Sequence, residues 1–335
     1  MTTEERIQAF GKMGNYIGAI DKGDLDALID QSKTQNAWFT SDNIRLALDG
    51  LAAYLDIERL KRWTSVYAIS KEQLKTVGIV MAGNVPFVGF HDLLSILISG
   101  HKAMIKLSSK DSVLITFLAN KLCELEPRFT DRIVFADQLK GFDAVIATGS
   151  DNSARYFEFY FARYPHIIRK NRTSCATLLG NETSAELNKL GADIFSHFGL
   201  GCRNVSKIYI PAGYHFPVFF ESIESYKDII HHHKYHNNYD YQKSIMLVNS
   251  IKFLDNGFLM ITENETMVSP ISVLFFEYYN NVTELKSKLA LNESKIQCIV
   301  GKSAPATVSF GQAQFPELWD YADQVDTIKF LTSLN

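Results

Sequence analysis

The spacing of apolar residues changes about sixty residues into the chain. Before that point they recur every three or four positions, which predicts helices at residues 4–16, 25–31 and 44–54. Beyond it, short apolar runs alternate with longer amphipathic stretches. The predicted strands are residues 76–82, 103–107, 132–135 and 144–147, and the predicted helices are residues 89–99, 112–124 and a stretch that opens at 148–150 and ends near 164. This alternation indicates a parallel sheet with helices on both faces.

A second unit of the same kind begins near Ser174. Its predicted strands are residues 175–179, 207–210, 244–248, 270–276 and 296–300, and its predicted helices are residues 184–195, 216–228 and 282–289. We therefore expect an α/β protein with a first domain at 1–173, a second at 174–301, and a C-terminal segment, 302–335, that packs back on the body.

Composition narrows the class of protein. The chain has 335 residues, 46% of them hydrophobic, and a net charge of −3, so neither nucleic acid nor an anionic membrane is an expected partner. Four widely spaced cysteines form no C-x-x-C pair and indicate reduced thiols of a cytoplasmic protein. The charged N-terminus predicts no signal peptide, and the longest apolar runs are too short to span a bilayer.

Cys202 is the strongest candidate for chemistry. It lies in the run Phe-Gly-Leu-Gly-Cys-Arg-Asn, just before the predicted strand at 207–210. Glycines on its N-terminal side allow close approach to the sulfur, and the strand would hold the loop still. An open approach on a rigid base favours a nucleophilic thiol, although most single cysteines are small buried residues beside a turn.

Three further segments with polar side chains follow predicted strands of the first domain. Asn84 follows the first strand, Lys106 with Ser108 and Ser109 ends the second, and Thr148-Gly149-Ser150 leads into a helix. Because carboxyl ends of parallel strands meet at one edge, we expect these residues to line a common site. A helix start suits a pyrophosphate, and a lysine with hydroxyls suits a ribose or phosphate. Ser108, Ser109 and Asp111 are also candidates to cap the helix at 112–124.

The order of these segments resembles the aldehyde dehydrogenase superfamily. Within it, the chain is similar to the acyl-CoA reductase family that includes the reductase subunit of the bacterial luminescence fatty-acid reductase. The resemblance covers roughly residues 70–335 and is most specific at residues 77–109, around Cys202 and in the ending Leu-Trp-Asp-Tyr-Ala-Asp-Gln-Val-Asp-Thr at 318–327. It implies two three-layer α/β domains, a Rossmann-like cofactor domain and a catalytic domain that carries the nucleophilic cysteine.

The resemblance also implies residue roles. Cys202 would carry the acyl group as a thioester, and the Asn84 amide with the Cys202 backbone N–H would form an oxyanion hole. Lys106 would bind the adenosine ribose, and Ser108 or Ser109 would lie near the 2′ position, where a phosphate distinguishes NADPH from NADH. Thr148, Gly149 and Ser150 would lie beneath the pyrophosphate, and Glu265 would contact the nicotinamide ribose.

One departure from hydrolytic aldehyde dehydrogenases affects the expected reaction. Their water-activating glutamate has no counterpart in residues 169–175, where Asn171 is the closest occupant. Absence of that base favours acyl transfer involving a thiol over hydrolysis. We therefore expect NADPH-dependent reduction of an acyl-CoA, of the fatty class by resemblance, to the aldehyde. NADH is the alternative cofactor.

Two alternatives remain open at this point. The acyl donor could be an acylated partner protein, or the chain could be a non-catalytic acyl-binding or assembly subunit. The resemblance also implies a homo-oligomer.

Several polar clusters admit a structural interpretation beside a functional one. His231, His232, His233 and His236 resemble metal ligands, but no proposed step needs a metal, so we expect a polar surface segment and no metal site. His197 could act as an acid or base or simply end a helix. The basic run at 169–172 could contact CoA phosphates or be a solvated loop, and Cys175 is expected to be buried and inert.

Overall fold

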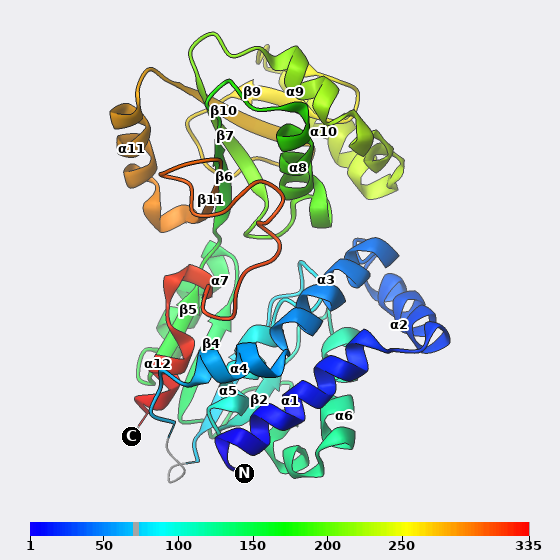
Figure 1. Ribbon diagram of the computed structural model, residues 1–335, viewed down its shortest axis with the longest axis vertical. Coiled ribbons are helices and arrows are strands. Elements are labelled where there is room, and N and C mark those ends of the chain that lie inside the picture. The colour runs from blue at the N-terminus through cyan, green and yellow to red at the C-terminus, as the bar shows by residue number, and fades with distance from the viewer. Residues whose placement is uncertain (70–73, 335) are drawn as a thin grey trace. The chain divides into compact units, whose positions relative to one another are not determined.

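Two separate β-sheets organise the part of the chain that the structure describes, residues 1–69 and 74–334 of a computed structural model (Figure 1). The chain divides into two units, one formed by residues 1–171 with 317–335 and the other by residues 172–316. Each unit has its own hydrophobic core. The boundary at 171/172 lies two residues before the expected one, and the expected C-terminal segment is divided, since residues 302–316 belong to the second unit.

The first unit contains a five-stranded parallel sheet in the order β3-β2-β1-β4-β5. Its strands are β1 (Thr76–Val80), β2 (Lys102–Lys106), β3 (Ile133–Phe135), β4 (Ala144–Thr148) and β5 (His166–Arg169). The chain progresses from β1 outward to β3 and then returns to β4 on the other side of β1. The point between β1 and β4, where the direction reverses, is where open parallel sheets bind ligands.

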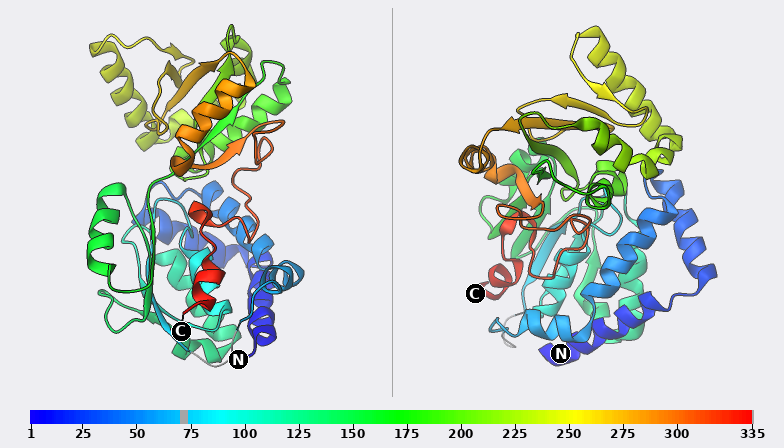
Figure 2. Two further views of the ribbon diagram at one scale, coloured as in Figure 1. Left: turned by 90° about the vertical axis from the view of Figure 1, so that its left-hand side faces the viewer. Right: turned by 45° about the horizontal axis from the view of Figure 1, so that its top comes forward.

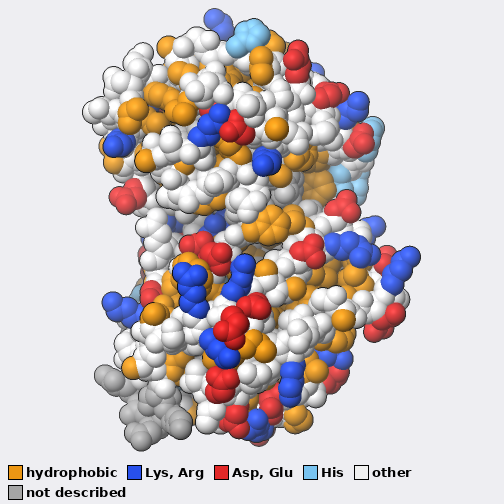
Figure 3. All heavy atoms as spheres, in the orientation of Figure 1, with side chains coloured by type: hydrophobic (Ala, Val, Ile, Leu, Met, Phe, Trp, Pro, Cys, Tyr) orange, Lys and Arg blue, Asp and Glu red, His pale blue; other side chains and the backbone are white. Residues whose placement is uncertain are grey.

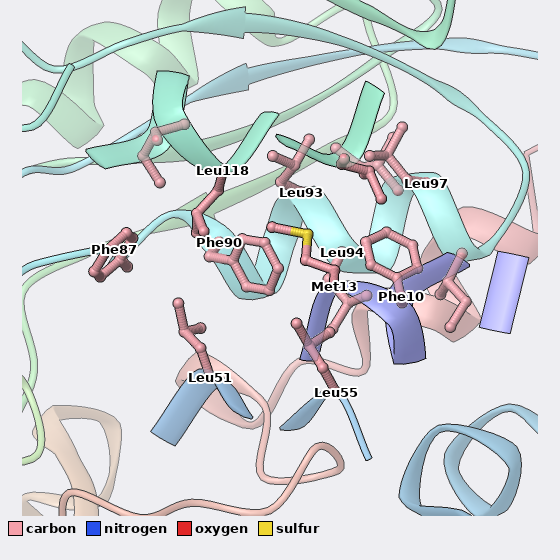
Figure 4. Close-up of a cluster of buried hydrophobic side chains, with 14 of the residues drawn as sticks. Phe10, Met13, Leu51, Leu55, Phe87, Phe90, Leu93, Leu94, Leu97 and Leu118 are labelled. Carbon is pink, nitrogen blue, oxygen red and sulfur yellow. The ribbon is translucent and has the colours of Figure 1, made fainter. Parts of the chain in front are cut away.

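Helices cover both faces of this sheet (Figure 2). They are α1 (Thr3–Gly18), α2 (Lys22–Gln35), α3 (Ser41–Tyr54), α4 (Ile57–Thr64), α5 (Phe90–Ile98), α6 (Val113–Leu125), α7 (Asp151–Phe161) and α12 (Thr327–Thr332), with short 3₁₀ turns η1 (Pro127–Arg132) and η5 (Ala322–Gln324). Helices α1, α5 and α6 contribute to the large core on one face, part of which Figure 4 shows. Helix α7 packs against β4 and β5 with a smaller apolar cluster.

Residues 317–334 return to the first unit and pack against its N-terminal helices. The indole Nε1 of Trp63 donates to the Tyr321 hydroxyl at 2.7 Å, and the Tyr67 hydroxyl donates to Asp326 at 2.9 Å. Trp63 is almost completely buried, so this segment fills part of the core and the indole N–H finds its partner there.

The second unit contains a six-stranded sheet in the order β11-β6-β7-β10-β9-β8, parallel except for β8. Its strands are β6 (Thr173–Thr177), β7 (Val205–Pro211), β8 (Leu254–Asp255), β9 (Met260–Glu263), β10 (Val273–Tyr279) and β11 (Ile296–Val300). Its helices are α8 (Ser184–Phe195), α9 (Phe216–Ser222), α10 (His233–Val248) and α11 (Val282–Leu291), with 3₁₀ turns η2 (Ser196–Gly199), η3 (Glu224–His231) and η4 (Glu293–Lys295). Helix α8 begins with a capping box formed by Thr183 and Glu186.

The structure corrects one predicted strand and adds others. Residues 244–248 are the last turns of α10 and not a strand. Tyr239 and Met246 are buried residues of that helix, whereas Leu247 and Val248 are 62% and 84% exposed, so only part of the apolar run enters the core. Strands β5, β8 and β9 are missed by the sequence prediction.

The surface carries mixed charges. On the face drawn in Figure 3, acidic and basic side chains are interspersed over both units, in keeping with the small net charge. Within the described ranges, no helix has both the length and the apolar character required to cross a bilayer.

Candidate active site

Cys202 lies in the turn that joins α8 and η2 to β7, and it is partly buried. The turn is attached to the neighbouring strand through Ser174 of β6. The Ser174 hydroxyl donates to the Cys202 carbonyl oxygen at 3.0 Å and accepts the backbone N–H of Cys298 at 3.2 Å. The backbone at Cys202 is therefore fixed to two strands of the sheet.

Asn204 anchors the same turn from within. It is only 1% exposed. Its Oδ1 accepts the Gly201 N–H at 2.8 Å, while its Nδ2 donates to the carbonyl oxygens of Ser196 at 2.7 Å and Asp193 at 3.1 Å. One amide thus joins the residue before Cys202 to the end of α8. The sequence prediction missed this role, although an asparagine in a glycine-rich turn is a common turn anchor.

Three consecutive residues before Cys202 have left-handed backbone conformations. The φ angles are 51° at His197, 58° at Phe198 and 76° at Gly199. Only glycine adopts this conformation without cost, so His197 and Phe198 are held there by their surroundings. The Phe198 ring packs on His232, with 4.3 Å between ring centroids. Burial lowers the pKa of His197 to about 4, so its imidazole is neutral at neutral pH.

The first unit gathers the other predicted residues at one edge of its sheet. In the parallel register, Val80 of β1 lies beside Lys106 of β2 and beside Ala147 of β4. Asn84, Lys106 and Thr148 therefore all follow or end strands at the carboxyl edge, around the reversal between β1 and β4. Asn84 and Lys106 are exposed there, as a ligand would require.

The loop after β1 and the loop after β2 are in close contact. A Cβ atom on Gly83 would lie 2.5 Å from the Ser108 hydroxyl oxygen, so only glycine fits beside that serine. The Ser108 hydroxyl accepts the Lys110 N–H at 3.2 Å. Ser109 is exposed, three residues after Lys106, and is more accessible to a ligand. The N-cap of α6 is Ser112, which makes no side-chain cap hydrogen bond, so neither Ser108 nor Ser109 is the cap residue.

The loop after β4 opens helix α7. Ser150 is its N-cap, and the Ser150 hydroxyl accepts the Ser153 N–H at 3.2 Å. Gly149 packs so tightly that a Cβ there would lie 2.7 Å from the Ser153 Cβ. Asp151, in the first turn, accepts the Asn171 N–H at 3.4 Å, so a carboxylate shares this helix start with any bound anion.

Glu265 lies in the loop between β9 and β10 and is exposed. Its carbonyl oxygen accepts a hydrogen bond from Lys207 Nζ at 2.8 Å. Two residues later, the Met267 carbonyl oxygen accepts from the Ser206 hydroxyl at 2.7 Å. The loop is thus attached to the first residues of β7, the strand that Cys202 precedes.

The basic run at 169–172 is not a solvated loop throughout. Arg169 ends β5 and is 3% exposed. Its guanidinium contacts Asp92 at 2.6 Å, donates to Thr327 Oγ1 at 2.9 Å and donates to the Ala322 carbonyl oxygen at 2.6 Å. Arg169 therefore stabilises the first unit and is unavailable to CoA phosphates.

The histidines at 231–236 give no metal centre. Among the described residues, no group of three or more His, Cys, Asp or Glu side chains could hold a metal ion. His231 and His236 instead contact Asp228 and Asp240 at 3.7 and 3.2 Å. His232 supports the Cys202 turn through its contact with Phe198.

Cys175 is completely buried in β6. Burial raises the pKa of its thiol and makes it unreactive, as the sequence predicts.

Sequence comparison supports the resemblance drawn from these motifs. Residues 40–173 match the model of the family described as acyl-CoA reductase (LuxC). No curated protein matches the chain.

Several solved structures with similar folds are aldehyde dehydrogenases. The indole-3-acetaldehyde dehydrogenase AldA of P. syringae, a mutant in complex with NAD+ and IAA, has a TM-score of 0.69 and 12% identity over 91% of this chain and 72% of its own. Aldehyde dehydrogenase 21 of Physcomitrella patens has a TM-score of 0.70 and 10% identity over 99% of this chain and 84% of its own. The Mycobacterium tuberculosis aldehyde dehydrogenase complexed with NAD+ has a TM-score of 0.63 and 13% identity over 86% and 71% of the two chains. The predicted fold is confirmed, and the family match over residues 40–173 agrees with the predicted relationship.

Proposed function

We propose that this chain, whose residues 40–173 match the acyl-CoA reductase (LuxC) family, reduces an acyl-CoA to the aldehyde through a thioester on Cys202. The observation that carries the proposal is the Cys202 turn. The partly buried Cys202 lies on backbone that Ser174 and Asn204 fix by hydrogen bonds, after residues held in left-handed conformations. A thiol that is both accessible and rigidly held suits covalent catalysis.

The first half of the reaction needs only the chain's own residues. The Cys202 thiolate attacks the acyl carbonyl carbon, and the C–S bond to coenzyme A breaks as the new thioester forms. In this proposal the developing oxyanion accepts hydrogen bonds from the Asn84 side-chain amide and the Cys202 backbone N–H. Each such donor contributes about 3 kcal/mol to stabilising the transition state.

The residues at the sheet edge of the first unit suit a nicotinamide nucleotide. Lys106 and Ser109 are exposed there, and the Gly83–Ser108 contact shows how closely the two loops approach. Lys106 would bind the adenosine ribose, Thr148 to Ser150 the pyrophosphate and Glu265 the nicotinamide ribose. When bound, the nucleotide supplies a hydride to the acyl group. Collapse of the resulting hemithioacetal returns the Cys202 thiolate and releases the aldehyde.

Ser109 is the residue we assign to the 2′-phosphate of NADPH. It is exposed close to Lys106 in the chain, whereas the Ser108 hydroxyl already accepts the Lys110 N–H. The residues from 169 to 175 contain no carboxylate, which favours a thiol over water as the second acyl acceptor. All four cysteines are outside disulfides, which supports the cytoplasm as the place of this reaction.

Steady-state turnover tests the proposal. Oxidation of NADPH should depend on long-chain acyl-CoA and should equal the coenzyme A released and the aldehyde trapped. Cys202→Ser should abolish turnover, and Cys123→Ser, which removes another partly buried thiol, should retain it. If Cys202→Ser turns over normally, the proposal is wrong. If only an acylated partner protein supports turnover, free acyl-CoA is not the donor.

A further inference from the structure

A buried carboxyl group joins two loops at the carboxyl edge of the first sheet. Asp111 lies between β2 and α6 and is 1% exposed. Its Oδ2 accepts the backbone N–H of Phe87 at 2.9 Å. Phe87 belongs to the loop between β1 and α5 that also carries Asn84. One carboxyl therefore connects the loop of Asn84 to the turn that follows Lys106.

The Asp111 hydrogen bond helps to hold Phe87 in an unfavourable backbone conformation. Its φ is 59°, a left-handed conformation that costs energy for any residue with a Cβ. Its ring is buried in the core cluster that Figure 4 shows in part. The ring is thus held by packing and the N–H by Asp111, and together they fix the backbone three residues after Asn84.

The end of helix α2 contacts the same loops. The Asn36 side-chain amide donates weakly to the carbonyl oxygens of Gly83 at 3.5 Å and Lys110 at 3.4 Å. The neighbouring Gln35 accepts the Ser112 N–H through its side-chain oxygen at 3.2 Å. Because the two Asn36 bonds are longer and join neutral groups, Asp111 is the stronger connection between the two loops when its carboxyl is ionised.

The Asp111 carboxyl differs from an ordinary structural carboxylate in its hydrogen bonding and in its pKa. Its Oδ1 is buried and has no hydrogen-bond partner among the described residues. Burial raises the pKa of Asp111 to about 7, although the N–H groups of Phe87 and Leu114 act in the opposite direction. The group therefore changes charge near neutral pH.

The charged side chains on neighbouring elements do not neutralise it. On its own turn Lys106 and Lys110 are exposed, and on α2 Lys33 is exposed. On α5, Asp92 is engaged with Arg169. The pKa of Asp111 is accordingly governed by burial and backbone N–H groups, without a contribution from a charged side chain in the described part of the chain.

We propose that Asp111 is a positioning residue for Asn84, and that its ionised form holds the Asn84 loop in the conformation needed for acyl transfer. A carboxylate accepts the Phe87 N–H more strongly than a neutral carboxylic acid does. Protonation loosens the loop, so the effectiveness of Asn84 rises with pH through the neutral range. This inference rests on the proposed function of Asn84 as an oxyanion donor.

Amide hydrogen exchange at Phe87 tests the connection without relying on activity. Exchange is measured between pH 5.5 and 8.5 and corrected for the intrinsic pH dependence of the amide. The Phe87 amide of the wild type should be roughly fivefold more protected at pH 8.5 than at pH 5.5, because hydrogen bonds to charged acceptors are stronger. In Asp111→Asn this pH dependence should vanish. Asp193→Asn, which alters another buried aspartate in the other unit, should keep it.

Kinetics of the wild type and Asp111→Asn test the role in catalysis. Above pH 8 the kcat of Asp111→Asn should be roughly fivefold below that of the wild type, the two should converge below pH 6, and KM for NADPH should be equal. Equal Phe87 exchange in the two proteins at every pH, or identical kcat profiles, overturns the inference. Lack of acyl-CoA turnover by the wild type would instead contradict the proposed function.

Discussion

Removal of the Asn204 amide is the perturbation whose consequences the structure defines most fully. Asn204→Ala leaves the Gly201 N–H without its side-chain acceptor, and the Ser196 and Asp193 carbonyl oxygens without their side-chain donor. Asn204 is almost completely buried, so water cannot replace its side-chain amide unless the surrounding residues rearrange.

The effect of Asn204→Ala on the turn depends on two opposing free energies, the loss of the Asn204 hydrogen bonds and the release of backbone strain. A buried polar group left unsatisfied costs about 1–3 kcal/mol, so loss of this anchor costs about 3 kcal/mol or more in total. The left-handed conformations of His197 and Phe198 cost about 1–2 kcal/mol each. Because the anchor and the strain that it opposes are of similar size, the turn should relax once Asn204 is gone and Cys202 should move.

Two measurements test whether the turn relaxes and Cys202 moves. Loss of the full ~3 kcal/mol would lower the melting temperature by roughly 6–12 °C, taking about 2–4 °C per kcal/mol for a unit of this size, and Asn204→Ala should lower it by less because relaxation of the turn recovers strain. The rate at which an acyl-CoA acylates Cys202 should fall about 100-fold, since displacement by about 1 Å is enough for such a loss. Alkylation of Cys202 by iodoacetamide should persist, because an unspecific reagent needs no defined geometry.

Asn188→Ala provides the matched control. Asn188 is also an asparagine of the second unit, and its Nδ2 donates to the Ser222 carbonyl oxygen at 2.9 Å and the Ser225 hydroxyl at 2.7 Å. Its loss should reduce stability without slowing the acylation of Cys202. Wild-type acylation in Asn204→Ala, or equal slowing in both variants, would refute the idea that Asn204 positions the thiol.

Three further changes probe the first unit. Gly83→Ala places a Cβ 2.5 Å from the Ser108 hydroxyl oxygen, so NADPH affinity measured by fluorescence titration should fall about tenfold; unchanged affinity would mean that this contact does not shape the site. Asp92→Ala leaves the buried Arg169 guanidinium without its carboxylate and should lower the unfolding free energy by about 3–5 kcal/mol; a melting temperature equal to the wild type's would contradict this. The pKa of Asp111 is raised to about 7, so its proton is bound more tightly in the folded state and its contribution to stability falls as pH rises from about 4 to 7. Asp111→Asn should therefore gain stability relative to the wild type across that range, by up to about 4 kcal/mol, and a constant difference in denaturant unfolding would show that the carboxyl does not titrate there.

Local patterns were sufficient for most of the architecture. The alternation of short apolar runs with amphipathic stretches predicted β1, β2 and β4 and the helices between them, because these strands lie between helical layers and each helix buries one face. The helix α10 shows where this reasoning fails. Ile245 to Val248 is apolar enough for a strand, but the buried positions of that helix, Tyr235, Tyr239 and Met246, are set by contacts with distant residues.

The sequence predicted the candidate site residues but not the hydrogen bonds that hold their loops in place. The order of Asn84, Lys106 and Cys202 along the chain was enough to expect their roles, and these roles stay predictions. The anchors could not be foreseen, because the Asp111–Phe87 hydrogen bond spans 24 residues and the Ser174–Cys202 bond spans 28. Such contacts depend on how loops meet at a sheet edge, which no local spacing encodes.

The most direct test of the Cys202 thioester is the intact mass of the protein after incubation with a long-chain acyl-CoA, before and after addition of NADPH. We expect a single acyl adduct that is absent in Cys202→Ser, present in Cys123→Ser, and discharged as aldehyde by NADPH. An adduct that survives in Cys202→Ser, or one released by NADPH as the free acid, would contradict this expectation.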